Sequence, residues 1–136
     1  MSPSDENETR ALLCSAFNYS GPAAVRYPRG SGPNAKVNLD LKPIEIGKAN
    51  LIKKGDPKVI FLNFGALLHE AKLVADELNL TLIDMRFIKP LDEEILRTYL
   101  KSADLFISLE DGSIAGGAGS AVQEFCSKEN IYIKSK

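Results

Sequence analysis

The sequence predicts an α/β protein with a mostly parallel sheet and helices on both faces. Short, unbroken apolar runs such as Val59–Leu62 and Leu105–Leu109 are typical of strands that are covered on both sides. Segments with apolar residues at helical spacing follow these runs, and glycine or proline separates the two kinds of segment. Strands and helices that alternate in this way form right-handed crossovers, which make the strands parallel.

The chain begins with a predicted helix. We expect Ser2 to be its N-cap, Pro3 to occupy its first position and Asp5 to complete a capping box. Residues 18–22 end this helix, and a short strand over residues 24–29 follows it directly. The apolar face of the helix is predicted from residues at helical spacing: Leu12, Leu13, Ala16 and Phe17.

Residues 31–43 are expected to form a linker. They are rich in Gly, Ser, Pro, Asn and Lys and contain few large apolar residues, so a domain boundary is placed among them. Residues 44–52 then predict one extended or hairpin element, which ends at Gly55-Asp56-Pro57.

The remaining elements alternate regularly. They are predicted as a strand at 59–62, a helix near 66–79, a strand at 80–85, a helix starting at 90–92, a strand at 105–109, a glycine-rich connection at 112–119, a last helix, and a fourth strand beginning at 131–133. The buried positions of the three helices are expected to be Leu67, Ala71, Val74 and Leu78, then Ile95, Leu96, Tyr99 and Leu100, then Ala118, Val122 and Phe125.

The composition is that of an ordinary globular chain. Of its 136 residues 44% are hydrophobic and 26% charged, and the net charge is -1. No concentrated basic surface is predicted, which argues against binding to nucleic acid or to an anionic membrane. No apolar run is long enough to cross a bilayer, and the amino terminus is acidic where a secretory signal is basic and then apolar. The sequence therefore predicts a cytoplasmic protein.

Two arginines three residues apart, Arg26 and Arg29, are the strongest candidates for ligand binding. An unpaired charge is costly in an apolar interior, so both guanidinium groups require an anion. The planar fork of arginine binds phosphate or carboxylate through two parallel hydrogen bonds. Pro28 and Gly30 favour a sharp exit at the end of the predicted strand. The alternative is that these are surface arginines paired with Asp or Glu.

Other polar segments follow predicted strands, where ligands of parallel sheets bind. Gly116–Gly119 has the position of a phosphate-binding loop but lacks the spacing of one, which favours tight packing of strand against helix. Asp84, Arg86 and Lys89 are candidates for a ligand site or for a network of ion pairs. Glu110-Asp111 is either an acid/base pair or a solvated turn.

The sequence shows no evident reaction centre. His69 is the only histidine and has no nucleophile or group of metal ligands in evident support. Cys14 and Cys126 are far apart and lie in apolar stretches, which favours reduced core thiols over a reactive thiol or a metal site. No catalytic, cofactor-binding or metal-binding residue is therefore assigned.

Several motifs together resemble the 1-deoxy-D-xylulose 5-phosphate synthase family, in the family's order and over nearly the whole chain. They are Ser4-Asp5-Glu6-Asn7-Glu8, Gly21-Pro22, Arg26-Tyr27-Pro28-Arg29-Gly30, Asn63-Phe64-Gly65, Asp84-Met85-Arg86-Phe87-Ile88-Lys89-Pro90-Leu91-Asp92 and Gly116-Gly117-Ala118-Gly119.

The resemblance implies a three-domain, homodimeric enzyme that uses thiamine diphosphate with Mg²⁺. Such an enzyme condenses pyruvate with glyceraldehyde 3-phosphate and releases CO₂, in non-mevalonate isoprenoid synthesis and in thiamine and pyridoxal synthesis. It further implies that residues 1–30 end a pyrimidine-binding domain, as a helix and a strand. Residues 44–136 correspond to the transketolase-like carboxy-terminal domain, without its last segment.

The resemblance assigns binding of the substrate phosphate to Arg29, with Arg26 as a second contact. It places the residues that hold the cofactor and Mg²⁺ in parts of the enzyme that have no counterpart here, so the 136 residues alone are expected to be inactive and to bind neither. The alternatives are a non-catalytic α/β binding or dimerisation module, or another thiamine diphosphate enzyme of the transketolase type.

Overall fold

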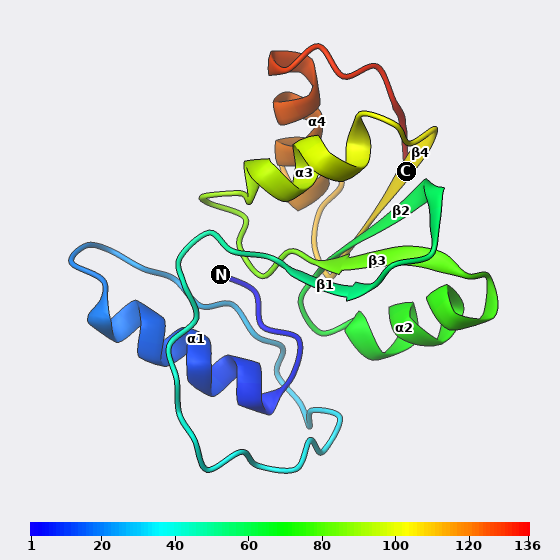
Figure 1. Ribbon diagram of the computed structural model, residues 1–136. Helices are drawn as coiled ribbons and strands as arrows, with labels where there is room; N and C mark the ends of the chain where they lie inside the picture. The colour runs from blue at the N-terminus through cyan, green and yellow to red at the C-terminus, as the bar shows by residue number, and fades with distance from the viewer.

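The computed structural model describes residues 1–136, which form four helices and five strands (Figure 1). In chain order the elements are α1 (Glu6–Asn18), β1 (Asn50–Lys53), β2 (Asp56–Phe64), α2 (Leu68–Glu77), β3 (Leu80–Asp84), α3 (Glu93–Leu100), β4 (Leu105–Glu110), α4 (Ala118–Lys128) and β5 (Lys134–Ser135). None of the helices combines the length and the apolar character that a membrane crossing needs.

The five strands form one sheet in the order β1-β3-β2-β4-β5. The pairs β2/β3, β2/β4 and β4/β5 are parallel, and only β1 pairs antiparallel, with β3. Helices α3 and α4 cover one face of the sheet and α2 covers the other (Figure 1). The predicted α/β fold is confirmed.

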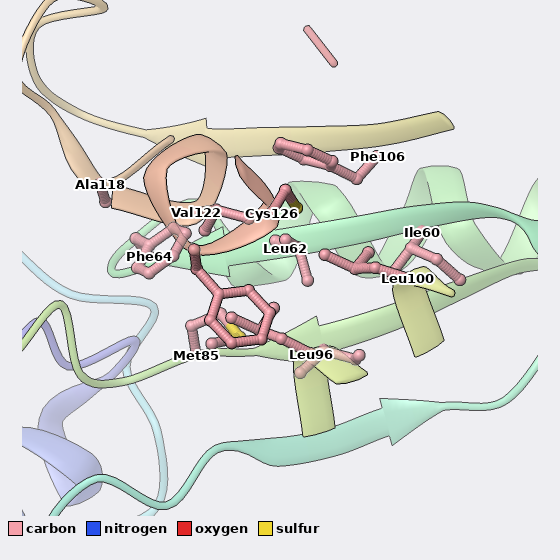
Figure 2. Packing of buried hydrophobic residues seen from close by; sticks show 12 residues of the cluster. Ile60, Leu62, Phe64, Met85, Leu96, Leu100, Phe106, Ala118, Val122 and Cys126 are labelled. Carbon is pink, nitrogen blue, oxygen red and sulfur yellow. The ribbon is translucent and has the colours of Figure 1, made fainter. Parts of the chain in front are cut away.

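The core consists of two layers, one on each face of the sheet. Because side chains alternate along a strand, Ile60, Leu62 and Phe64 of β2 pack beneath α3 and α4, whereas Phe61 packs toward α2. Figure 2 shows the larger layer, in which Leu62 lies among side chains from α3, α4 and the neighbouring strands. The smaller layer contains Ala71 and Ala75 of α2.

The amino-terminal helix begins later than predicted. Asp5, and not Ser2, is the N-cap, since its carboxylate accepts a hydrogen bond from the backbone N–H of Glu8 at 2.7 Å. Ser2 lies instead in a buried extended segment and donates its N–H to the carbonyl of Arg86. The predicted apolar face is only partly buried, because Leu12 is fully covered while Phe17 is 91% exposed.

The strand predicted over residues 24–29 is absent. This segment has no regular structure and joins no sheet. It makes two hydrogen bonds to Met1: the N–H of Arg26 donates to the carbonyl of Met1, and the amino group of Met1 donates to the carbonyl of Ala24. Residues 44–52 do not form a hairpin, since β1 pairs with β3. The last strand starts at Lys134 and not at residue 131, because the N–H of Ile131 donates to the carbonyl of Cys126 in α4 and pairing with β4 begins only at Lys134.

The other helices agree better with the sequence. Asp92 caps α3 by accepting the N–H of Ile95 at 3.2 Å, as the predicted start at residues 90–92 requires. Helix α4 buries the three predicted residues. Helix α2 buries Ala71 as predicted, but the other three predicted positions, Leu67, Val74 and Leu78, are exposed. Ala75 is buried instead, because small residues let this helix lie close to the sheet.

Candidate functional site

The segment that carries Arg26 lies over the carboxyl ends of β2 and β4. A small cavity of ≈ 30 Å³ is lined by Arg26, by Phe64 at the end of β2 and by Asp111 just after β4. The crossover after β2 runs to one face of the sheet and the crossover after β4 runs to the other, so these strands flank the point where the topology reverses. Ligands of open parallel sheets bind at such points.

A larger cavity of ≈ 590 Å³ adjoins the small one. Tyr27, Pro28 and Ala66 line both cavities, and His69 of α2 lines only the larger one. The volume is within the range of small-ligand sites. The segment around the two arginines therefore borders a continuous hollow between the starts of α1 and α2.

The guanidinium groups of Arg26 and Arg29 are exposed and have no acidic partner in the chain. All of the ion pairs use other cations: Lys48, Lys53, Lys58, Lys72, Arg86, Arg97 and Lys128. Neither arginine therefore has, within this chain, the Asp or Glu partner that the alternative requires. Arg26 lines the small cavity, whereas Arg29 lies on the exposed loop beyond it and lines neither cavity.

Asp84 at the end of β3 and Arg86 just after it belong to a partly buried network with α1, whereas the ion-pair alternative was a network that fixes the next helix, α3. Nε of Arg86 donates to Oε1 of Glu8 at 2.6 Å. Asp84 is fully buried and accepts a hydrogen bond from Nδ2 of Asn63 at 3.0 Å. Burial, and then the neighbouring charge of Glu8, raise the pKa of Asp84 from 3.8 to about 8. Lys89 is exposed and outside this network.

Sequence reasoning missed Glu8 and Asn63. Glu8 lies in the first turn of α1, where the helix dipole alone is enough to favour an acidic residue. One signal for Asn63 was present: an amide in the apolar, buried second half of β2 needs specific partners.

The glycine-rich connection is a packing feature, as predicted. A Cβ atom at Gly119 would lie 2.4 Å from Oγ of Ser108, and one at Gly117 would lie 2.0 Å from the carbonyl oxygen of Ser113. The carboxylate of Glu110 accepts the N–H of Ala118 and so occupies the amino end of α4, where a phosphate would otherwise bind. Glu110 is therefore a helix cap, a role that neither predicted alternative included.

Residues 47–135 match the family described as transketolase, C-terminal domain. The chain belongs to this family. A split-gene transketolase, solved as an inactive beta4 tetramer, is similar with a TM-score of 0.81 and 29% identity, over 98% of this chain and 46% of that one.

Two curated relatives are 1-deoxy-D-xylulose-5-phosphate synthases. That of Pseudomonas fluorescens (strain Pf0-1) is 53% identical over 131 residues, which is 96% of this chain and 21% of the relative. That of Hahella chejuensis is 54% identical over 133 residues, 98% of this chain and 20% of the relative. The chain thus spans about one fifth of the length of the relatives that it matches.

The transketolase C-terminal domain offers no donor set for a Mg²⁺-diphosphate group. No group of three His, Cys, Asp or Glu side chains could hold a metal ion. Two buried carboxyl groups already have partners in the chain: Glu8 is bonded to Arg86, and Asp84 is bonded to Asn63. The residues present therefore do not fit the cofactor that the resemblance implies.

The histidine and the two cysteines have no catalytic partner. His69 is exposed on the first turn of α2. Cys126 is buried in the core, and burial raises the pKa of its thiol, which disfavours the reactive thiolate. Cys14 is half-buried on α1 and also free.

Replacing Glu110 by alanine is expected to lower the free energy of unfolding by about 1 kcal/mol, the usual cost of losing a helix cap. Glu124→Ala is the matched control, because Glu124 is exposed on the same helix and makes no hydrogen bond through its side chain. Urea unfolding of both variants measures the difference. Equal midpoints would show that Glu110 does not cap α4.

Proposed function

We propose that this chain is the carboxy-terminal region of a 1-deoxy-D-xylulose 5-phosphate synthase and supplies part of its site for the substrate phosphate. The observation that carries the proposal is the identity of 53% over 96% of the chain, which includes the arginine segment as well as the transketolase C-terminal domain. In this proposal the synthase uses thiamine diphosphate and Mg²⁺ held by other parts of the enzyme, and it acts in the cytoplasm.

The proposed role of Arg29 is to bind the phosphate of glyceraldehyde 3-phosphate, with Arg26 as a second contact. Their exposure and lack of acidic partners leave both guanidinium groups available to an anion. A phosphate held by two such forks fixes the distant aldehyde of the same substrate, so binding energy is converted into orientation. Pyruvate has no phosphate and gains nothing from these residues.

We also propose the division of the chain into residues 1–30, a linker at 31–43 and a carboxy-terminal domain at 44–136. The absence of regular structure between α1 and β1 supports a linker there. The family match, which begins at residue 47, supports the last boundary.

The experiment is a chimeric synthase in which this chain replaces the matching 131 residues of the Pseudomonas fluorescens relative. The chimera is expected to turn over pyruvate and glyceraldehyde 3-phosphate, whereas the 136 residues alone are not. A folded chimera without turnover, or turnover by the chain alone, would contradict the proposal.

In this chimera, Arg29→Ala is expected to raise KM for glyceraldehyde 3-phosphate about 10- to 100-fold, the worth of one or two hydrogen bonds to a charged group. KM for pyruvate should change less than about twofold, because the arginine fork contacts only the phosphate. Arg29→Lys should restore only part of the affinity, since lysine lacks the planar fork. Lys36→Ala, at an exposed cation of the linker, is the control. Equal increases in KM for the two substrates would contradict the role assigned to Arg29.

Assembly of the synthase as a homodimer is likewise proposed. The structurally similar split-gene transketolase is described as a beta4 tetramer, which shows that a chain of this fold can associate with copies of itself. Sedimentation of the chimera as a dimer is the expected result. A monomer at micromolar concentration would contradict it.

A further inference from the structure

Two buried carboxyl groups from distant parts of the chain meet at the carboxyl end of β3. Glu8 comes from the first turn of α1 and is 9% exposed, and Asp84 is the last residue of β3 and is 0% exposed. Two carboxylates are rarely buried side by side, because removing both charges from water and placing them close together is very costly.

The partners of these carboxyl groups are unequal. The carboxylate of Glu8 is fully satisfied, since Oε1 accepts Nε of Arg86 at 2.6 Å and Oε2 accepts both N–H and Oγ–H of Ser4 at 2.8 Å. Asp84 accepts only Nδ2 of Asn63, on Oδ1, and its Oδ2 has no partner. One cation therefore faces two carboxyl groups, and two buried oxygens, Oδ2 of Asp84 and Oδ1 of Asn63, lack a hydrogen bond.

A proton on Oδ2 of Asp84 relieves the excess negative charge and satisfies the first of these two oxygens. It removes the second negative charge, and it turns the unpartnered oxygen into a donor that can bond to the neighbouring carboxylate of Glu8. Burial and the charge of Glu8 favour this proton, as the raised pKa of Asp84 indicates, and the hydrogen bond from Asn63 opposes it only in part.

No further cation neutralises the second carboxylate in place of this proton. The two carboxyl groups border a cavity of ≈ 450 Å³, and Asn50 of β1 stands opposite Asp84 in the sheet. The other charged residues that line this cavity are two acids and two bases: Asp5, Arg10, Asp40 and Lys42. Their charges cancel, and Arg86 is the one cation that is hydrogen-bonded to the pair.

The carboxyl pair is connected to the arginine segment by the first four residues of the chain, which we call the strap (Met1–Ser4). Ser4 is bonded to Glu8, and the N–H of Ser2 donates to the carbonyl of Arg86 at 2.7 Å. At its other end, the carbonyl of Met1 accepts the N–H of Arg26 at 2.9 Å. The strap is packed closely against the end of β2, because a Cβ atom at Gly65 would lie 2.5 Å from Oγ of Ser2.

We propose that Glu8 and Asp84 share one proton and that this proton-linked pair holds the strap, and through it Arg26, over the carboxyl end of the sheet. Glu8 and Asp84 are thus positioning residues for the arginine segment. That this segment binds a substrate phosphate rests on the proposed function, whereas the shared proton and the hold on the strap do not.

The experiment is a pH titration of the 136-residue chain by NMR, with ¹³C-labelled carboxyl groups. The carboxyl carbon of Asp84 is expected to titrate near pH 8. In Glu8→Gln its midpoint should fall by at least about one pH unit, because the neighbouring charge is removed. Titration of Asp84 close to pH 4 in the unchanged chain would overturn the proposal, without the need for any variant.

Hydrogen exchange distinguishes a proton-dependent role of Asp84 from a merely structural one. Protection factors of the Ser2 and Arg26 amides, taken relative to the amides of β2, should fall at least about tenfold when the pH rises past the Asp84 midpoint. Asp84→Asn, whose amide donates as the protonated acid does, should make this ratio independent of pH. Asp104→Asn, at an exposed acid paired with Lys58, is the control and should keep the pH dependence. An unchanged pH dependence in Asp84→Asn would overturn the proposal. No substrate enters these measurements, so they stand or fall separately from the phosphate assignment.

Discussion

Leu62→Ala is expected to lower the free energy of unfolding by about 3 kcal/mol, within the range of roughly 2–5 kcal/mol for buried leucines. Leu62 is 0% exposed, and β2 pairs with a strand on each side, so its neighbours are held in place and cannot close around a cavity. Its side chain lies in the larger core layer between the sheet and the helices α3 and α4 (Figure 2). The loss combines the missing burial of three carbon groups with the cost of the cavity.

The same substitution at an exposed leucine separates burial from side-chain chemistry. Leu73 on α2 is 60% exposed, and Leu73→Ala should change stability by no more than about 0.5 kcal/mol. Urea unfolding should show a lower midpoint for Leu62→Ala at an unchanged slope. Similar midpoints for the two variants would mean that β2 is not the centre of the core.

The central strands and the last helices could be predicted because local and tertiary signals agree there. The apolar runs of β2 and β4 are short and rich in strand-forming residues, and α4 shows one apolar face that the sheet covers. The spacing of apolar residues cannot show whether another element covers the apolar face of a helix. This is why α1 was predicted to bury Phe17, which is 91% exposed.

The errors at the edges of the sheet have a related cause. Strand β5 has two residues and is held through backbone hydrogen bonds to β4, so its side chains carry no alternating pattern. The choice of β3 over β2 as the partner of β1 depends on the path of the whole chain, which local composition does not contain.

Of the candidate site, one part could be predicted from the sequence and the other could not. The arginine segment was recognisable from two charges beside a proline and a glycine, and its place over β2 and β4 follows from the parallel topology. The carboxyl pair was not recognisable, because Glu8 and Arg86 are 78 residues apart and meet only when α1 folds against β3. Each of these residues, taken alone, is typical of a helix start or of a solvated turn.

The stability of the chain is expected to fall as the pH rises from about 5 to about 7, by at most about 1.4 kcal/mol for each pH unit. Asp84 has an ordinary pKa of 3.8 in the unfolded chain, and burial beside Glu8 raises it to about 8 in the folded protein. Between these values the folded state holds a proton that the unfolded state has released. Each rise in pH therefore favours unfolding, and the stabilisation is complete below pH 4 and lost above pH 8.

Other groups act outside this pH window or in the opposite direction. The pKa values of Glu6, Asp76 and Glu129 are lowered because their carboxylates accept hydrogen bonds. Their contribution to the stability of the folded protein is therefore lost only at acid pH. Burial lowers the pKa of the Met1 amino group from 8.0, which favours folding as the pH rises toward that value. These contributions to stability are the same in the unchanged chain and in Asp84→Asn. The difference in stability between the two proteins therefore reports on Asp84 alone.

Urea midpoints at pH 5, 6 and 7 measure this difference directly. The unchanged chain should lose stability over the series, and Asp84→Asn should not, because asparagine keeps a donor toward Glu8 and cannot titrate. The two proteins should then differ most at the highest pH, where the buried carboxyl pair is closest to carrying two charges with Arg86 as its only hydrogen-bonded cation. Parallel stability curves for the two proteins would mean that Asp84 is already ionised at pH 5. In that case Glu8 and Asp84 would have to be held together by Arg86 and Asn63 alone.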